Sequence, residues 1–401
     1  NEFILAINND LETTICSSKN ANGLYHAYNT IQIDLKKQSM DVQHLDLMLE
    51  GQVAALSSGI LNIDDAIGVL ESLFASDLYR EDMRSFMLYP VKKVTPFLDK
   101  NIIEPHSISK SKLLKTMLRK NDLTLIEQDA DGQVRFRPQF RNGFDLQSAL
   151  HQMIDKEDNR NLVDQEYDLV MEIFEEVFDH RNYTGRSGTM FSYEGIGSIY
   201  WHMISKLLLV VQENYFRAVR MDEPAVKVKN MGQLYYNIRG GLSATKTPEE
   251  YGAFPYDPYS HTPAHSGAQQ PGMTGQVKEE ILTRFGELGC MVTQGRIKFE
   301  PYLLRRDEFI TGKKEFQYYN VSHQKIILNI KKNQLAYTFC QVPVIYTLTG
   351  GENSLKLEHN DGSIVELDGN ALRKKDSRHI FNRDNAIKQI NLNLDTGLLF
   401  D

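Results

Sequence analysis

The densest set of residues able to do chemistry lies in one polar segment, residues 251–276, where four prolines alternate with aromatic, amide and imidazole side chains. The carboxylate of Asp257 stands there between Tyr256 and Tyr259. Proline and tyrosine limit the entropy lost when such a segment is ordered, while amides, hydroxyls and imidazoles can hydrogen-bond sugar hydroxyls or an anion. This pattern favours a carbohydrate pocket with Asp257 as a candidate general acid, and an interdomain linker is the alternative. The other candidate substrate-binding residues of the segment are His261, Thr262, His265, Gln269 and Gln270.

A metal site in the same segment is the weaker interpretation. His261 and His265 are four residues apart, which would place both on one face of a helix. Pro258 and Pro263 argue against a helix there. No HExxH motif or Cys/His cluster supplies the further ligands that zinc needs. We therefore expect these imidazoles to hydrogen-bond substrate or phosphate, with no metal and no cofactor other than inorganic phosphate as a co-substrate.

A second candidate segment, residues 183–202, passes from a loop of small residues into an apolar helix. Amide groups at a helix N-terminus attract anions, and Arg186 could add a bidentate contact to a phosphate. Glu194 is the second candidate general acid, because a carboxylate at the edge of an aromatic pocket can have a raised pKa. The alternative is an acid that balances the helix dipole. Trp201 could pack on the apolar face of a sugar ring.

Helices must position these segments. The apolar spacing predicts helices followed by long loops, and residues 196–216 are apolar around most of the helix circumference, which predicts an inner helix in contact with protein on several sides. A hairpin is expected where Asp131-Gly132 separates two short apolar runs. The helices are expected at about 43–58, 62–76, 109–119, 144–154, 164–180, 195–217, 225–239 and 273–288.

After Gly289 the sequence changes to short runs of β-branched and aromatic residues divided by turn signals such as Gly350-Gly351. Strands are expected at 325–330, 335–346, 354–357, 364–367 and 387–392. The fold class is therefore mainly α with a C-terminal all-β domain. A helical (α/α) toroid-like domain, whole or incomplete, is expected over 1–289, and a β-sandwich is expected over 290–401.

Composition excludes several classes of protein. With 45 Lys+Arg against 53 Asp+Glu and 41% apolar residues, the chain has the balance of a soluble globular protein, and nothing points to nucleic acid. The apolar run at 207–211 is far shorter than the roughly 20 residues that a membrane span requires. Three scattered cysteines favour a reducing, cytoplasmic compartment over a periplasmic or secreted one. Because the sequence opens at Asn1 without a leader, we expect a processed chain or a piece whose partner is a missing N-terminal part.

Three stretches carry a resemblance to a known family: residues 197–203 (GSIYWHM), the polar segment with the helix that follows it, and residues 295–301 (GRIKFEP), which open the β tail. In this order they resemble the end of an (α/α)6 glycoside phosphorylase or hydrolase of the cellobiose phosphorylase-like group. The resemblance concerns architecture and local texture over about 180–401. It implies a six-hairpin catalytic toroid and a phosphate site, for which Arg186, His261 and Thr262 are candidates. The segment that carries that family's catalytic aspartate is not found in this sequence.

The leading functional hypothesis is a carbohydrate-active enzyme, or the C-terminal part of one, that cleaves a glycosidic bond of an oligosaccharide by hydrolysis or phosphorolysis. Glu194 or Asp257 would act as the general acid. The two alternatives are a carbohydrate-binding or structural module without catalytic groups, and a polysaccharide lyase on a similar helical toroid.

Overall fold

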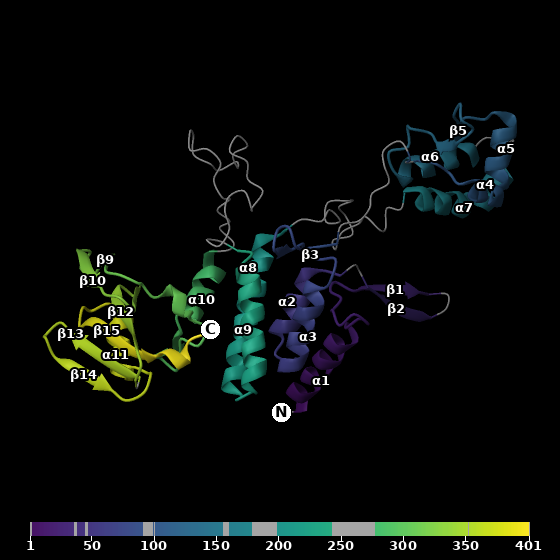
Figure 1. Cartoon of the computed structure of the whole chain (residues 1–401). Helices are drawn as coiled ribbons and strands as arrows, with labels where there is room; N and C mark the ends of the chain where they lie inside the picture. Colours follow the sequence, from purple (N-terminus) through teal and green to yellow (C-terminus); the bar gives the residue numbers. More distant parts are fainter. Residues whose placement is uncertain are drawn as a thin grey trace, which may run out of the picture. The chain divides into compact units, whose positions relative to one another are not determined.

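The computed structural model divides the chain into two compact units (Figure 1). Unit 1 comprises Asn1–Tyr25, Leu49–Phe86 and Ile199–Asp401, and unit 2 comprises His26–Met48 and Met87–Ser198. The structure describes residues 2–35, 38–44, 47–90, 99, 101–154, 160–178, 199–242, 277–351 and 353–400.

Unit 1 is organised around α8 (Trp201–Arg220), which contacts α2, α3, α9 and α10. Twelve of its residues are buried, and they point in several directions around the helix. The prediction of an inner helix is therefore confirmed. In Figure 1, α8 and α9 stand side by side as an antiparallel pair, with α10 next to them. The other helices and the short β-ribbon before α8 are α1 (Glu2–Ser17), α2 (Leu49–Ser57), α3 (Ile63–Phe74), β3 (Tyr79–Arg80), β4 (Ser85–Phe86), α9 (Ala225–Arg239) and α10 (Val277–Glu287).

The C-terminal part of unit 1 is built from strands around its own core, which runs from Leu288 to Leu399. Its main sheet has five strands in the order β11-β12-β15-β13-β14. Only the β12–β15 pair of that sheet is parallel, and α11 (Lys374–Asn382) lies in the connection that leads to β15. The elements of this part are β7 (Cys290–Thr293), β8 (Arg296–Phe299), the 3-10 helix η4 (Arg306–Glu308), β9 (Lys314–Tyr319), β10 (Lys325–Ile330), β11 (Gln334–Phe339), β12 (Val342–Thr349), β13 (Ser354–His359), β14 (Ile364–Leu367), β15 (Ile387–Asp395) and η5 (Thr396–Leu398).

Two sequence-based expectations need correction. The single strand expected at 335–346 is two antiparallel strands, β11 and β12, because Cys340 and Gln341 both take positive φ angles of 48° and 65° and turn the chain back. The helix expected from residue 43 begins only at Leu49, because residues up to Gln43 pair as strand β2. The turn at Cys340 and Gln341 carries no glycine, so the usual sequence signal for a turn is missing there.

Unit 2 contains a helical core and two β-ribbons. Its core packs α5, α6 and α7 against the predicted hairpin, which forms as β5 and β6. The elements are β1 (Thr30–Asp34), β2 (Ser39–Gln43), α4 (Pro105–Lys110), α5 (Lys112–Lys120), β5 (Ile126–Gln128), β6 (Val134–Phe136), α6 (Gly143–Ile154) and α7 (Arg160–Phe178).

The described residues thus form a mixed α/β structure, with helices and ribbons before Glu287 and a five-stranded sheet after it. The toroid, the sandwich and the domain boundary at 289/290 stay predictions. No helix in the described ranges is long and apolar enough to cross a bilayer.

One carboxylate of α7 caps α5 in unit 2. Glu166 accepts hydrogen bonds from the Ser111 hydroxyl at 2.6 Å and from the N–H groups of Lys112 and Leu113 at 3.0 and 2.9 Å. Burial raises the pKa of Glu166, but the bonds from Leu113, Ser111 and Lys112 outweigh it and hold the pKa below its usual range. The carboxylate therefore supplies the acceptor that the first N–H groups of a helix need.

Replacing Glu166 with glutamine is expected to destabilise α5 locally by about 1–2 kcal/mol. Hydrogen–deuterium exchange over residues 112–120 measures this as faster exchange. Because the folded pKa is lowered, the contribution of Glu166 is present above about pH 4.5 and is lost as the pH falls below that value. Glu172→Gln on the same helix is the control, since Glu172 is exposed. Equal exchange in the two variants at pH 7 would contradict the capping role.

Candidate functional site

Most of the candidate residues from the sequence lie outside the described part of the chain. Trp201 is the exception: it is the first residue of α8 and is half-buried. The candidates outside the described residues are Arg186, Glu194, Tyr256, Asp257, Tyr259, His261, Thr262, His265, Gln269 and Gln270. Their spatial arrangement stays a prediction.

The structure does describe the helix ends to which these two segments connect. Residues 183–202 run into α8, and residues 251–276 run into α10, which begins at Val277. The two helices contact each other. Their first turns meet where His202 of α8 lies against Glu279 of α10. The two candidate segments, which are separated in sequence, therefore enter the described core at the same place.

A short chain of polar side chains marks this meeting point. The Nε2 atom of His202 lies 3.4 Å from Oε1 of Glu279, and its Nδ1 atom lies 3.4 Å from the hydroxyl of Tyr200. His202 is 22% exposed and Glu279 only 6%. Lys278 reaches the same carboxylate oxygen at 3.8 Å. An imidazole held between a buried carboxylate and a phenol can donate or accept a proton and can hydrogen-bond an anion or a hydroxyl group.

One carboxylate oxygen of Glu279 is available as a hydrogen-bond acceptor. Its Oε2 atom is buried and receives no hydrogen bond from any residue that the structure describes. Buried carboxylate oxygens are rarely left unsatisfied, because desolvation without a hydrogen bond is costly. A donor from a neighbouring segment or from a bound ligand would satisfy this oxygen. Glu279 thus points to a polar site at this end of α8.

The next residue, Glu280, is a candidate proton donor. Burial raises the pKa of Glu280; Arg239 opposes that shift and the negative charge of Glu287 adds to it. A carboxyl group with a raised pKa can act as a general acid. Glu280 therefore joins Glu194 and Asp257 as a carboxylate to test.

A buried ion-pair cluster fixes α10 in place beneath the site. Glu287 is 3% exposed and accepts hydrogen bonds from the Tyr235 hydroxyl at 2.6 Å, from Arg239 Nε at 3.1 Å and from Arg284 at 2.8 Å. Arg284 also binds Glu308 at 2.5 Å, and the two carboxylates raise the pKa of its guanidinium against the effect of burial. We name these residues the Glu287 cluster. It joins α9, α10 and η4 and so fixes the C-terminal end of the helix whose first turn carries Glu279.

Replacing Glu287 with glutamine is expected to lower the free energy of unfolding by about 2 kcal/mol, because two guanidinium groups lose a buried, hydrogen-bonded countercharge. Urea unfolding followed by circular dichroism measures the change. Glu358→Gln is the matched control, since Glu358 forms a more exposed pair with Lys388 at 2.6 Å and should cost less than about 1 kcal/mol. Equal losses in the two variants would show that the cluster adds no more than a surface pair.

Sequence reasoning missed His202 and Glu279 as site residues. His202 was part of the segment 183–202, but only Trp201 was selected from its helical end, and Glu279 sits in an unremarkable charged turn. The signal available in the sequence was their position after the candidate segments: His202 is the second residue of α8 and Glu279 is the third residue of α10. Among the described residues, no group of His, Cys, Asp and Glu could hold a metal ion.

The comparisons with known proteins concern unit 2. Residues 94–181 match the family model of GH149 phosphorylase insertion domain 2. This range includes α4 to α7 and the β5–β6 hairpin. A comparison with curated proteins finds no match. This segment is therefore similar to an insertion domain of a glycoside phosphorylase, which supports a phosphorylase-related chain. A specific relation to the cellobiose phosphorylase-like group stays a prediction.

Proposed function

We propose that the chain belongs to a glycoside phosphorylase that cleaves a glycosidic bond of an oligosaccharide with inorganic phosphate. The observation that carries this proposal is the match of residues 94–181 to a phosphorylase insertion domain. An insertion domain interrupts a larger catalytic fold, and the two candidate segments follow it in the sequence. In this proposal the helices of unit 1 belong to an (α/α) toroid, and the strands after Gly289 form a sandwich-like domain.

In the proposed reaction, a carboxylic acid gives its proton to the glycosidic oxygen while a phosphate oxygen bonds to the anomeric carbon. The products are a sugar 1-phosphate and a shortened oligosaccharide. Asp257, Glu194 or Glu280 would supply the proton. Arg186, His261 and Thr262 would bind phosphate, because guanidinium, imidazole and hydroxyl groups are suitable donors to its oxygens.

The sugar would be bound by aromatic and amide side chains. Trp201, Tyr256 and Tyr259 would pack on sugar rings, and amides such as Gln270 would pair with hydroxyl groups. His202 would form the wall between the two segments. Its Nε2 atom faces Glu279 at 3.4 Å, and a substrate hydroxyl or phosphate would bond to its Nδ1 atom in place of the Tyr200 hydroxyl. His265 and Gln269 would extend the same polar surface. No cofactor is required.

The proposal is tested by incubating the chain with laminari- and cello-oligosaccharides, with and without phosphate. Phosphate-dependent formation of a sugar 1-phosphate is expected, and its loss in one of Glu194→Gln, Asp257→Asn or Glu280→Gln would identify the acid. Free sugar formed equally without phosphate would indicate a hydrolase instead. Unsaturated products would indicate a lyase. Binding without any product would favour the non-catalytic module.

A further inference from the structure

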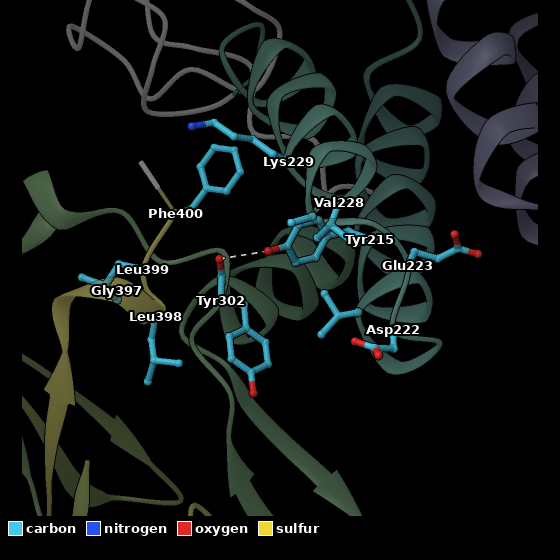
Figure 2. Close-up of a pocket in the computed structure, with 12 residues that line it drawn as sticks. Tyr215, Asp222, Glu223, Val228, Lys229, Tyr302, Gly397, Leu398, Leu399 and Phe400 are labelled. Carbon is cyan, nitrogen blue, oxygen red and sulfur yellow. Dashed lines mark hydrogen bonds between the residues drawn. The ribbon is translucent and has the colours of Figure 1, made fainter. Parts of the chain in front are cut away.

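A pocket lies at the opposite end of α8 from His202, between the α8–α9 turn and the segment Gly397–Phe400 (Figure 2). Its volume is approximately 420 Å³, within the range of about 300–1,000 Å³ that is typical of small-ligand sites. From His202 to Val219 the helix rises about 26 Å, at roughly 1.5 Å per residue. The pocket is therefore separate from the site at the first turns of α8 and α10.

The walls of the pocket are mainly aromatic and aliphatic. Tyr302, Leu398 and Phe400 line one side and Val228 the other (Figure 2). The backbone carbonyl of Tyr302 accepts a hydrogen bond of 3.1 Å from the Tyr215 hydroxyl. Burial, with a smaller contribution from Tyr302, raises the pKa of Tyr215 to about 12, so this hydroxyl keeps its proton at neutral pH. The backbone at Tyr302 is held by a permanent donor.

The ring of Phe400 is also fixed. It stacks on Tyr236 with ring centroids 5.3 Å apart. It also covers Gly232, where a Cβ atom would lie 2.3 Å from the ring. The glycine of α9 therefore makes room for the aromatic wall. The ring of Phe400 and the backbone at Tyr302 are therefore held in place before any ligand arrives, which lowers the ordering cost of binding.

Charged groups stand at the edges of this apolar space. Figure 2 shows the Asp222 carboxylate on the side of Tyr302 and the Lys229 ammonium beside Phe400, whereas Glu223 points away from both. Asp222 and Lys229 are exposed. A purely apolar ligand would leave these two groups unused, and an anion would meet the charge of Asp222. A neutral ligand with apolar faces and hydroxyl edges fits both kinds of lining.

We propose that this pocket binds one sugar ring of an oligosaccharide, as a second carbohydrate site apart from the one at His202. The CH face of the ring packs on Tyr302 and Phe400, and its hydroxyl groups donate to Asp222 and accept from Lys229. The choice of an oligosaccharide as the ligand rests on the proposed function. The pocket joins the α8–α9 pair to the C-terminal strands, so a bound sugar would contact both parts of unit 1.

The test measures binding of laminari- and cello-oligosaccharides to the full chain by isothermal titration calorimetry, in a His202→Ala background that weakens the first site. Tyr302→Leu is expected to weaken the remaining binding about tenfold, because an aromatic packing surface is lost. Tyr302→Phe should keep it. Tyr319→Leu is the matched control, since Tyr319 is 62% exposed on β9. Asp222→Asn should weaken binding severalfold, because it removes the carboxylate that would accept from the sugar hydroxyl groups. Asparagine is chosen because it tolerates the φ angle of 55° at this position.

Unchanged affinity in both Tyr302→Leu and Asp222→Asn would overturn the second site, as would the absence of any oligosaccharide binding in this background. The result is distinguishable from a failure of the proposed function. That failure would appear as no sugar 1-phosphate in the activity assay, whereas the pocket is judged by binding alone.

Discussion

Replacing Gly289 with alanine is expected to lower the free energy of unfolding by about 3–4 kcal/mol. Gly289 follows α10 with a φ angle of +67°, and a Cβ atom there would lie 2.2 Å from the backbone at Glu300 and Pro301. The left-handed conformation costs a non-glycine residue about 1–2 kcal/mol, and overpacking adds about 1–3 kcal/mol. The neighbouring backbone is itself fixed, because the Glu300 N–H donates to the Gly289 carbonyl at 2.8 Å. Urea unfolding of the full chain measures the change.

Gly295→Ala separates the two contributions. Gly295 has a φ angle of +74°, but its nearest neighbour to a Cβ atom is the end of the Lys374 side chain at 3.8 Å. This variant should therefore show only the conformational cost of about 1–2 kcal/mol. If the two variants lose the same stability, the close approach at Gly289 does not contribute.

The same glycine connects the fold to the site. The 3-10 and hairpin elements after Gly289 bring Glu308 to Arg284, and Arg284 binds Glu287. Movement of the backbone at Gly289 would thus disturb the Glu287 cluster, which fixes α10, the helix that carries Glu279. A variant at Gly289 that still folds is expected to lose activity through displacement of Glu279, without any substitution among the site residues.

Much of the fold could be predicted from the sequence, because periodicity records which face of an element is buried. The all-round apolar pattern of α8 and the Asp131-Gly132 hairpin are both confirmed. The predictions failed where the chain turns without glycine, as at Cys340 and Gln341. Helix α11 was not predicted either; its sequence is highly charged, and only Ile380, Asp376 and Ser377 are buried.

The site was less predictable than the fold. The sequence pointed to segments whose composition was unusual, and the structure adds the helix ends where those segments arrive. The contact between His202 and Glu279 joins residues 77 positions apart. Such a pair leaves no local pattern, because each residue sits in an ordinary first turn of a helix. Only the packing of α8 on α10, which depends on buried side chains along both helices, brings them together.

The pocket between the α8–α9 turn and Gly397–Phe400 could not be predicted for a related reason. Its aromatic wall is formed by Tyr302 and Phe400, which come from separate short loops. The Tyr215 hydroxyl of α8 bonds to the backbone at Tyr302, and Gly232 of α9 leaves room for the Phe400 ring. None of these residues belongs to a motif. The pocket exists because the last residues of the strand region return to the α8–α9 pair, where Phe400 packs on Tyr236 and over Gly232 of α9. The N–H of Phe400 also bonds to the carbonyl of Leu304, in the loop after β8, at 3.0 Å.

Replacing His202 with alanine is expected to reduce kcat/KM for phosphorolysis by about 100-fold or more, the lower end of what a positioned acid–base group contributes. The imidazole is held between Glu279 and the Tyr200 hydroxyl at 3.4 Å on each side. Its loss removes the ring nitrogen that would bond to the ligand in place of Tyr200, and it removes the partner of a buried carboxylate. Glu279→Gln keeps the shape and should cost less, about tenfold, because it only changes the tautomer and orientation of the imidazole. Initial rates at varied phosphate and oligosaccharide measure both effects.

The matched control for this prediction is His151→Ala, since His151 is an exposed histidine of α6 in unit 2. Thermal unfolding of each variant separates a loss of activity from a loss of folded protein. If His202→Ala folds normally and keeps wild-type rates, the first turns of α8 and α10 are not part of the active site.

The double variant, His202→Ala with Glu279→Gln, shows whether Glu279 acts through His202 or on the substrate directly. If Glu279 acts only through His202, adding Glu279→Gln to His202→Ala should cause no further loss, whereas additive losses would show that Glu279 contacts the substrate directly through its free oxygen.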